Sequence, residues 1–431
     1  MAKPSTSVPS STGPRQRADA SAVESEVLIV GGGMVGLTLA SALGGAGLSV
    51  CVVDREDPAT VLDGAFDARA SAIAFGSQRV LQALGLWPRL ERDAQPILDI
   101  RVTDGDSSMF LHFDHRDLGD APFGYIVENQ VIRRALFDHV RTMPSVRIHA
   151  PVTLASLARE KGHVQAMLGD GRKLKAAVAI GADGRHSRLR EEAGIATTNW
   201  SYPQTGIVCT VAHSRPHHGV AHERFLPAGP FAILPMTPVT RDGQVRHRSS
   251  IVWTERAHLA PALLRLSEGD FNAELAKRFG GYLGALQVLG RRWSFALALM
   301  HAESYIAHRL ALVGDAAHAI HPIAGQGLNM GLRDVAAAAE VLVDARRLGL
   351  DIGDVSVLER YQRWRRFDNL VFCAATDGLN RLFSNDLAPL RLARDLGLAA
   401  VNRLGPLRRF FMRQAMGVLG ELPRLVRGEP L

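Results

Sequence analysis

The stretch between Arg309 and Asp334 contains residues whose types and spacing suit the binding of a polar ligand. An apolar run, Leu310 to Val313, predicts a buried strand that ends just before Asp315. A glycine-rich loop follows, and an alanine-rich pattern then predicts a helix from near Leu328 to about Arg347. Asp315 can accept hydrogen bonds from hydroxyl groups, and the free N–H groups at the start of the helix present a positive end. The segment is therefore predicted to hold a ligand that carries hydroxyl groups and negative charge.

A second ligand-binding pattern lies near the N-terminus, in EVLIVGGGMVGLTLASALGGAGLSVCVVD. Gly31, Gly33 and Gly36 fall between a predicted strand and a predicted helix, where they allow a tight turn and a close approach to pyrophosphate. The next predicted strand ends in Asp54, at the spacing where an acid binds ribose hydroxyls. This arrangement predicts an adenine dinucleotide. Because Asp315 and the helix start suit the ribityl chain and pyrimidine edge of a flavin, the two patterns together predict FAD.

Residues 321–334, HPIAGQGLNMGLRD, resemble the signature of the ubiquinone-biosynthesis hydroxylases (the UbiH/UbiF group), within the p-hydroxybenzoate-hydroxylase-like FAD monooxygenases. Further segments around Arg69, Glu128 and Asp183 resemble the same family, and the resemblance spans nearly the whole chain after residue 25. It implies an α/β fold: a Rossmann-like FAD-binding domain of the p-hydroxybenzoate hydroxylase type, with an inserted β-sheet substrate domain and a C-terminal helical region.

The resemblance and the changes in composition together predict the domain limits. Residues 1–24, rich in Ser, Thr, Pro and Ala, are predicted to form a disordered tail. The FAD-binding domain is expected to be discontinuous, with residues 25–98, 125–198 and 295–375. Short alternating stretches predict that residues 99–124 and 199–294 form a substrate-binding sheet. Residues 376–431 are predicted to form C-terminal helices.

The resemblance also implies which residues bind the cofactor: Gly31, Gly33, Gly36, Asp54, Arg69, Glu128, Asp183, Asp315, Gly325, Gly327, Leu328 and Asn329. Simpler explanations stay open for three of them. Arg69 could form a surface ion pair with Asp63 or Asp67. Glu128 and Asp183 could cap the helices that follow them.

The substrate side of the site rests on position in the resembling motifs. Pro322, with His321 beside it, is expected at the junction of flavin and substrate. Phe231, Ile233 and Pro235 lie in a stretch that resembles the strand passing over the substrate, so they could line the pocket or belong to ordinary sheet core. The sequence shows no Ser–His–Asp nucleophile and no obvious catalytic base.

Composition and charge exclude several other classes. The chain has 431 residues, 47% of them apolar, and a net charge of +7, which is modest for this length. No apolar run is long enough to span a bilayer, nothing resembles a nucleic-acid-binding module, and the histidines lack the regular spacing of metal ligands. The three cysteines lie far apart. These features predict a soluble cytoplasmic protein without a metal.

The resemblance implies the activity. The expected enzyme is an FAD-dependent monooxygenase that hydroxylates the ring of a polyprenylated phenol on the way to ubiquinone, using O2 and either NAD(P)H or a protein electron donor. Two alternatives stay open: a flavin oxidoreductase of the same fold acting on another aromatic or prenyl substrate, and a non-catalytic FAD-bound subunit of a membrane-associated complex. The W-x-W-x-I-P pattern of halogenases is absent.

The C-terminal segment suggests where the protein works. Residues 401–431 carry six Arg and two Glu, and residues 407–419 can form a helix with Leu407, Phe410 and Phe411 on one face. Arg409 and Arg413 project on the opposite side. This pattern predicts peripheral attachment to the inner membrane, within a multi-enzyme complex for ubiquinone biosynthesis. Alternatively, the apolar face packs on the FAD-binding domain.

Overall fold

The computed structural model describes residues 23–62, 67–105, 110–241, 243–320, 325–383, 397 and 401–431. The predicted tail lies outside this part of the chain except for Val23 and Glu24, which begin strand β1 (Val23–Val30). They pair with Leu174 and Lys175 of β11 (Lys173–Gly181). The first strand therefore begins two residues before residue 25, the predicted start of the FAD-binding domain.

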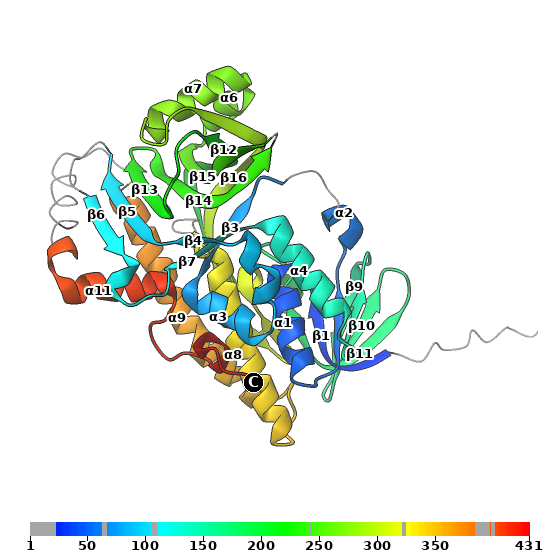
Figure 1. The fold of residues 1–431 in the computed structure, drawn as a ribbon. Coiled ribbons are helices and arrows are strands. Elements are labelled where there is room, and N and C mark those ends of the chain that lie inside the picture. Colours follow the sequence, from blue (N-terminus) through cyan, green and yellow to red (C-terminus); the bar gives the residue numbers. More distant parts are fainter. Residues whose placement is uncertain are drawn as a thin grey trace, which may run out of the picture.

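A largely parallel sheet forms the centre of the dinucleotide-binding part of the fold (Figure 1). Its strand order is β17 (Ile306–Ala307), β18 (Leu310–Leu312), β11, β1, β2 (Val50–Val53) and β8 (Val146–His149). The hairpin of β9 (Leu154–Arg159) and β10 (Val164–Leu168) extends it as an antiparallel addition to β11. The residues of 27–30 and 50–53 are all buried, as expected for strands with both faces covered.

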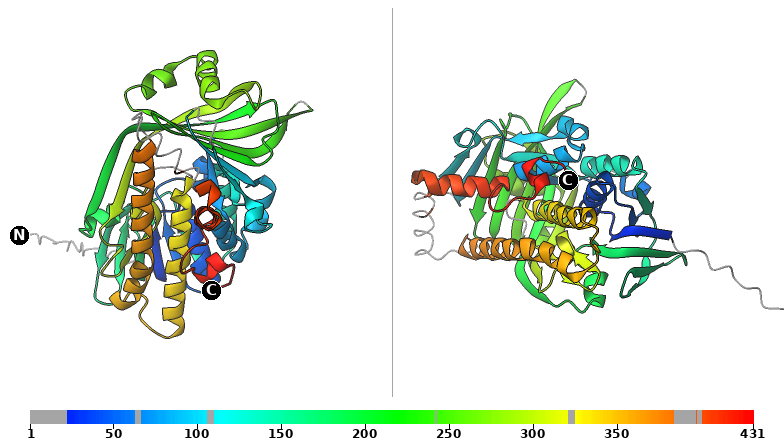
Figure 2. Two further views of the ribbon diagram at one scale, coloured as in Figure 1. Left: turned by 90° about the vertical axis from the view of Figure 1, so that its left-hand side faces the viewer. Right: turned by 90° about the horizontal axis from the view of Figure 1, so that it is seen from below.

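Three long helices pack in succession against this sheet. Helix α1 (Met34–Gly45) contacts β1 and β2, α8 (Gly327–Arg347) contacts α1, and α9 (Val355–Phe383) contacts α8; α8 and α9 lie side by side in Figure 2. Residues 336–339 of α8 are buried alanines, whose small side chains allow neighbouring helices to come close. The bounds of α8 agree with the helix predicted from the alanine-rich pattern.

A second, mostly antiparallel sheet lies beside the first part (Figure 1). Its order is β19 (His318–Ala319), β16 (Leu286–Ala302), β12 (Thr197–His213), β15 (Gln244–Arg256), β14 (Gly229–Arg241), β13 (Val220–Leu226), β5 (Asp99–Asp104) and β6 (Phe110–Asp114). Helices α6 (Ala260–Arg265) and α7 (Glu268–Phe279) cover its outer face. Strand β12 begins before residue 199 and β16 ends after residue 294, so the sheet extends beyond the predicted limits of the substrate domain. The division into domains remains a proposal.

A small sheet, β3 (Ala70–Ala74), β7 (Gly124–Glu128) and β4 (Gln95–Ile97), lies between these two parts. Helices α3 (Phe75–Ala83) and α4 (Asn129–Arg141) follow β3 and β7; α2 (Pro58–Leu62) and α5 (Arg188–Glu192) are short. Apolar residues of the small sheet, the large sheet and α11 (Gly405–Met416) meet in one cluster, here called the junction cluster, which includes Ile126, Phe225, Met236, Phe383, Met412 and Met416. The last helix, α12 (Arg424–Arg427), packs on α3 and α8.

Candidate functional site

The glycines after β1 are packed as a dinucleotide-binding turn requires. Gly31 has a φ of +108°, and a side chain there would lie 2.3 Å from the Ala182 carbonyl oxygen. A side chain at Gly36 would lie 1.9 Å from the Gly31 carbonyl oxygen, so α1 can start close to β1 only because both residues are glycine. Gly33 differs, because a side chain there would project into open space. That open space is where a phosphate group can approach the start of α1.

A cavity beside this turn fits the ribose and phosphate part of a dinucleotide. Gly32, Gly33, Asp54 and Arg133 line it. One Asp54 carboxylate oxygen accepts the Gly32 N–H, and the other accepts the Glu56 N–H at 2.8 Å. The Nε of Arg133 is buried without a hydrogen-bond partner among the described residues. A carboxylate for hydroxyls and a guanidinium for phosphate therefore face the same space. Arg133 did not stand out in the sequence, because it lies on an ordinary amphipathic helix.

Asp315 lies at the end of β18, as predicted, in a turn that starts with Gly314 at a φ of +59°. Its side chain is accessible to solvent, and no described residue forms a hydrogen bond with its carboxylate. Desolvation by the surrounding protein raises the pKa of this carboxyl, while His318 and Arg185 act in the opposite direction. An accessible acceptor among many protein atoms suits the hydroxyls of a ribityl chain, which can supply the missing hydrogen bonds.

The loop around Asp183 faces the Asp315 turn. Arg190 is buried and donates from Nη1 to the Ala316 carbonyl oxygen at 2.9 Å, so its guanidinium connects this loop to the Asp315 turn. Ser187 caps α5 by accepting the Arg190 N–H at 3.1 Å. Asp183 accepts the Leu189 N–H at 3.3 Å with one oxygen, and its other oxygen is buried without a partner in the described chain. Helix capping and cofactor binding thus both remain open for Asp183.

The start of α8 is arranged to offer backbone N–H groups. Gly327 and Leu328 lie in its first turn, and no side chain caps this end of the helix among the described residues. Gly325 has a φ of +61°, and a side chain there would lie 3.0 Å from the Ala72 Cβ. Asn329 is fully buried: its amide accepts the Ala74 N–H at 2.8 Å and donates to the Ala72 carbonyl oxygen at 2.9 Å. Its side chain therefore fastens the glycine loop to β3, which leaves its backbone N–H as the group that could face a cofactor.

Arg69 and Glu128 have protein partners in this structure. Arg69 Nη2 lies 2.7 Å from an Asp67 carboxylate oxygen, which is the simpler explanation left open above, and its guanidinium stacks on the Trp293 ring with the centroid 4.4 Å away. Glu128 precedes α4 without capping it through its side chain, and accepts from Arg248 Nη2 of β15 at 2.7 Å. Both residues thus lie where the large sheet contacts the dinucleotide-binding part, and their cofactor role stays a prediction.

The structure places the predicted substrate residues on the face of β14 that is turned toward α6 and α7. Phe231 and Ile233 are fully buried in the core between the sheet and the helices α6 and α7, so they are sheet core, the alternative interpretation. Pro235 is buried and follows the same alternation along the strand. The side chains that point toward the dinucleotide-binding part are those in between; Leu234 and Met236 belong to or pack against the junction cluster.

His321 and Pro322, the residues predicted at the junction of flavin and substrate, lie outside the described residues. Between positions 23 and 431, the described parts of the chain contain no group of three or more His, Cys, Asp and Glu side chains placed to hold a metal ion. None of the described helices is long and apolar enough to cross a membrane.

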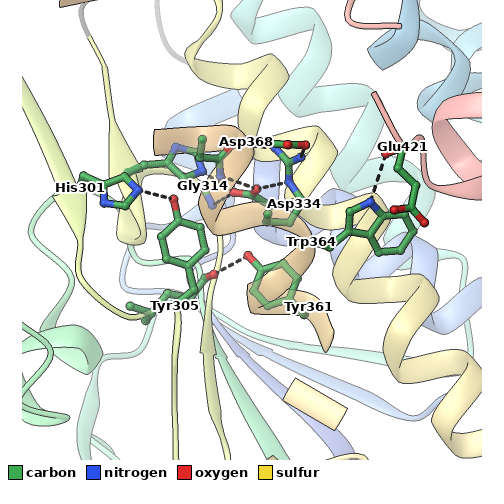
Figure 3. A network of polar contacts seen from close by, with 12 residues as sticks. His301, Tyr305, Gly314, Asp334, Tyr361, Trp364, Asp368 and Glu421 are labelled. Atoms are coloured by element: carbon green, nitrogen blue, oxygen red, sulfur yellow. Dashed lines mark hydrogen bonds and ion pairs between the residues drawn. The ribbon is translucent and has the colours of Figure 1, made fainter. Parts of the chain in front are cut away.

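A buried polar network lies behind the Asp315 turn and was not predicted from the sequence (Figure 3). Asp334 of α8 is fully buried and accepts the Gly314 N–H at 3.0 Å and His318 Nε2 at 2.5 Å. Its second oxygen accepts from Arg365 Nε at 2.9 Å and from Asn369 Nδ2 at 3.0 Å, both on α9. Burial by itself raises the pKa of this carboxyl, but the positive partners outweigh it and lower the pKa below its ordinary range. Asp334 therefore joins the Asp315 turn, α8 and α9 in one rigid unit.

The network continues toward the large sheet through aromatic and histidine side chains. Tyr305 lies with its hydroxyl 3.2 Å from His301 Nε2, and Tyr361 of α9 donates to the Leu312 carbonyl oxygen at 2.7 Å (Figure 3). Burial lowers the pKa of His301 to about 4, so this imidazole is neutral at neutral pH. One signal in the sequence could have revealed the network: Asp334 is an acid on the face of an alanine-rich helix that must be buried.

Fold and site together define an FAD-binding protein of the flavin monooxygenase type. The family model for the FAD binding domain matches residues 24–367, which covers the fingerprint, the Asp183 loop, Asp315 and α8. Among solved structures, p-nitrophenol 4-monooxygenase PnpA from Pseudomonas putida DLL-E4 is similar, with a TM-score of 0.75 and 21% identity over 91% of this chain and 98% of that chain. This likeness confirms the predicted fold class.

Similar proteins show to which group of FAD-dependent enzymes the chain belongs. Ubiquinone hydroxylase UbiL of Rhodospirillum rubrum is 52% identical over 98% of this chain and 97% of its own length. The 3-demethoxyubiquinol 3-hydroxylase of Escherichia coli is 36% identical over 91% and 98%, and the human mitochondrial ubiquinone biosynthesis monooxygenase COQ6 is 31% identical over 90% and 91%. The chain belongs to the FAD-dependent hydroxylases of ubiquinone biosynthesis, and the family inferred from residues 321–334 is confirmed.

Proposed function

We propose that this protein uses FAD and O2 to hydroxylate the aromatic ring of a polyprenylated phenol on the way to ubiquinone, with NAD(P)H or a protein as electron donor. The full-length likeness to a ubiquinone hydroxylase, at 52% identity, is the observation that carries this proposal. Three features support it: the cavity beside Gly33 and Asp54, the Asp315 carboxylate and the start of α8, the last two without side-chain partners among the described residues. They suit the ribose and phosphates, the ribityl chain and the flavin ring of FAD, respectively.

In this proposal the chain binds, orients and shields the cofactor, which supplies the oxygen chemistry once it is bound and reduced. Asp54 and Arg133 would hold ribose and phosphate, and Asp315 the ribityl hydroxyls. The N–H groups at Gly327 to Asn329 would stabilise negative charge on the flavin ring by about 1–2 kcal/mol. The apolar side chains of the junction cluster would keep water from the reacting ring.

The test is a single turnover with labelled oxygen. The purified yellow protein is reduced with dithionite, which removes any dependence on the natural donor, and is mixed with a prenylated phenol and isotopically heavy O2. Hydroxylation gives a product that carries one heavy oxygen atom, measured by mass spectrometry. Reduction of the prenyl chain would add hydrogen without oxygen, and a non-catalytic FAD-bound subunit would leave the phenol unchanged; either result would overturn the proposal.

We further propose that the protein attaches peripherally to an anionic membrane surface through α11, where it meets its lipid-soluble substrate within a multi-enzyme complex. Met412 and Met416 hold the helix on the junction cluster, while Leu407, Phe410 and Phe411 remain exposed. The helix therefore packs through its methionines, and the apolar face predicted from the sequence is the one left exposed.

Charge supports the same proposal. Arg409 and Arg413 are exposed, and within the described chain neither forms an ion pair. Arginine near anionic lipid contributes about 1 kcal/mol, and exposed aromatic side chains can enter the headgroup region. A helix with exposed apolar and basic residues that is anchored by its other face suits reversible, salt-sensitive binding.

Flotation with anionic liposomes tests this attachment. The double substitution Phe410→Ser and Phe411→Ser leaves the buried methionines in place and should abolish flotation, whereas added salt should weaken flotation of the unchanged protein. The matched control replaces Leu348 and Leu350, two exposed apolar residues beyond α8, with serine. Equal flotation of all three proteins would contradict attachment through α11.

A further inference from the structure

Glu223 is an ionisable residue in the middle of the large sheet, on the face turned toward the dinucleotide-binding part. It lies in β13, which is flanked by β14 and β5 and is therefore not an edge strand. Ala221 and Phe225, two positions before and after it, belong to the junction cluster. Because side chains alternate along a strand, Glu223 points to the same side as these two residues.

The surroundings of Glu223 across the sheet are apolar. Glu223 is paired directly with Val102 of β5 on one side and with Ala232 of β14 on the other. The next residues in this row are Leu111 of β6, opposite Val102, and Val252 of β15, opposite Ala232. Glu223 is the one ionisable side chain in this row of described residues. A carboxyl placed among apolar neighbours is costly unless it has a hydrogen-bond partner.

No described residue forms a hydrogen bond or ion pair with the Glu223 carboxyl, and the residue is partly accessible to solvent. Desolvation raises the pKa of this carboxyl to about 7. Both the acid and its carboxylate are therefore present at neutral pH, which is the range that suits a group exchanging protons with a ligand.

The junction cluster connects this face of the sheet with the flavin loop. Leu234 and Met236 of β14 belong to or pack against the cluster, and so does Ala72 of β3. Ala72 is the residue that approaches Gly325 and accepts a hydrogen bond from Asn329 at the start of α8. An aromatic ring bound against this cluster would thus lie between the predicted flavin loop and the Glu223 side of the sheet.

We propose that Glu223 binds the phenolic hydroxyl of the aromatic substrate and accepts its proton, an inference that rests on the proposed hydroxylase function. In this step the phenol O–H bond breaks and a carboxyl O–H bond forms. The electron pair stays on the phenolate oxygen and makes the ring richer in electrons, which favours attack on an electrophilic oxygen. The proton returns to the product oxygen before release, so Glu223 ends as it began.

Two substitutions separate binding from proton transfer, with a phenol carrying one isoprene unit and its methyl ether as probes. Glu223→Leu removes the hydrogen bond, so the phenol should bind about tenfold to a hundredfold more weakly, while binding of the ether is unchanged. Glu223→Gln keeps a hydrogen-bond acceptor but cannot take a proton, so phenol binding should stay close to that of the unchanged protein. Its single-turnover hydroxylation rate should fall by about a hundredfold or more.

The matched control is Glu255→Gln, which removes a carboxylate paired with Arg278 at 3.3 Å on the opposite face of the same sheet. It should leave the discrimination between phenol and ether unchanged. Flavin content and thermal unfolding of each variant report on folding. Glu223→Leu should be at least as stable as the unchanged protein, because it removes a carboxyl that has no partner among the described residues.

The outcomes distinguish this inference from the proposed function. If the unchanged protein hydroxylates the phenol and Glu223→Gln does so at the same rate, Glu223 is not the proton acceptor and the proposed function stands. If Glu223→Leu weakens the phenol and the ether equally, the residue is part of the pocket wall and the proposal is overturned. If the unchanged protein neither binds nor hydroxylates any prenylated phenol, the proposed function fails and this inference fails with it.

Discussion

Replacing Asp334 with alanine would remove the carboxylate at the centre of the buried network in Figure 3. That carboxylate is fully buried and accepts hydrogen bonds from the Gly314 N–H, His318, Arg365 and Asn369. The substitution removes the buried carboxylate that pairs with Arg365, which keeps only the half-exposed Asp368 at 3.1 Å, and it frees the turn that carries Asp315. Breaking a buried pair in this way costs about 3–5 kcal/mol, a large share of the stability of a typical domain.

The comparison that isolates burial is Asp344→Ala on the same helix. Asp344 pairs with Arg424 Nη2 at 2.5 Å, but its side chain is 33% exposed, so its loss should cost about 1 kcal/mol or less. Urea unfolding, followed by circular dichroism and by release of flavin fluorescence, measures both variants. Asp334→Ala should unfold at lower urea and lose flavin before the rest of the protein unfolds. Equal free energies of unfolding for the two variants would refute the argument that the buried network holds the site.

Four further results are expected. Asp315→Ala should bind FAD about tenfold to a hundredfold more weakly, and a purified variant with full flavin content would contradict the ribityl assignment. Gly33→Val should yield colourless protein, because its side chain would fill the space beside the phosphate-binding turn. A chain starting at Val23 should melt like the full chain, whereas one starting at Val27 should melt lower because it loses the pairing of Val23, Glu24 and Ser25 with β11. Folding lowers the pKa of Asp334, so the stability that its ionised carboxylate contributes is complete above the ordinary pKa of about 4 and is lost as the pH falls toward the folded pKa. In urea unfolding at decreasing pH, the difference in free energy of unfolding between the unchanged protein and Asp334→Asn should therefore shrink.

The parts of the site that the sequence predicts well are those fixed by local geometry. Gly31 and Gly36 are recognisable because backbone packing within one strand–turn–helix unit excludes any side chain. Asp315 is recognisable because it lies in the turn just after a buried strand. The partners of Arg69 and Glu128 were harder to predict, because Trp293 and Arg248 come from strands far away in the sequence. Local patterns contain no information on which distant strand will supply a partner.

The substrate face illustrates a second limit, which concerns register. Residues 230–236 of β14 are all apolar, so the alternation that would mark the two faces of the strand is missing there. A choice of residues displaced by one position therefore selects the opposite face of the sheet. Phe231 and Ile233 are large and attractive as pocket residues, but α6 and α7 cover their side of the sheet. Once pairing with β13 is known, Ala232 is directly opposite Glu223, and the face that carries the carboxyl is the face turned toward the flavin loop. The same pairing that places Phe231 and Ile233 in the sheet core therefore points to a candidate proton acceptor in a sequence without an obvious catalytic base.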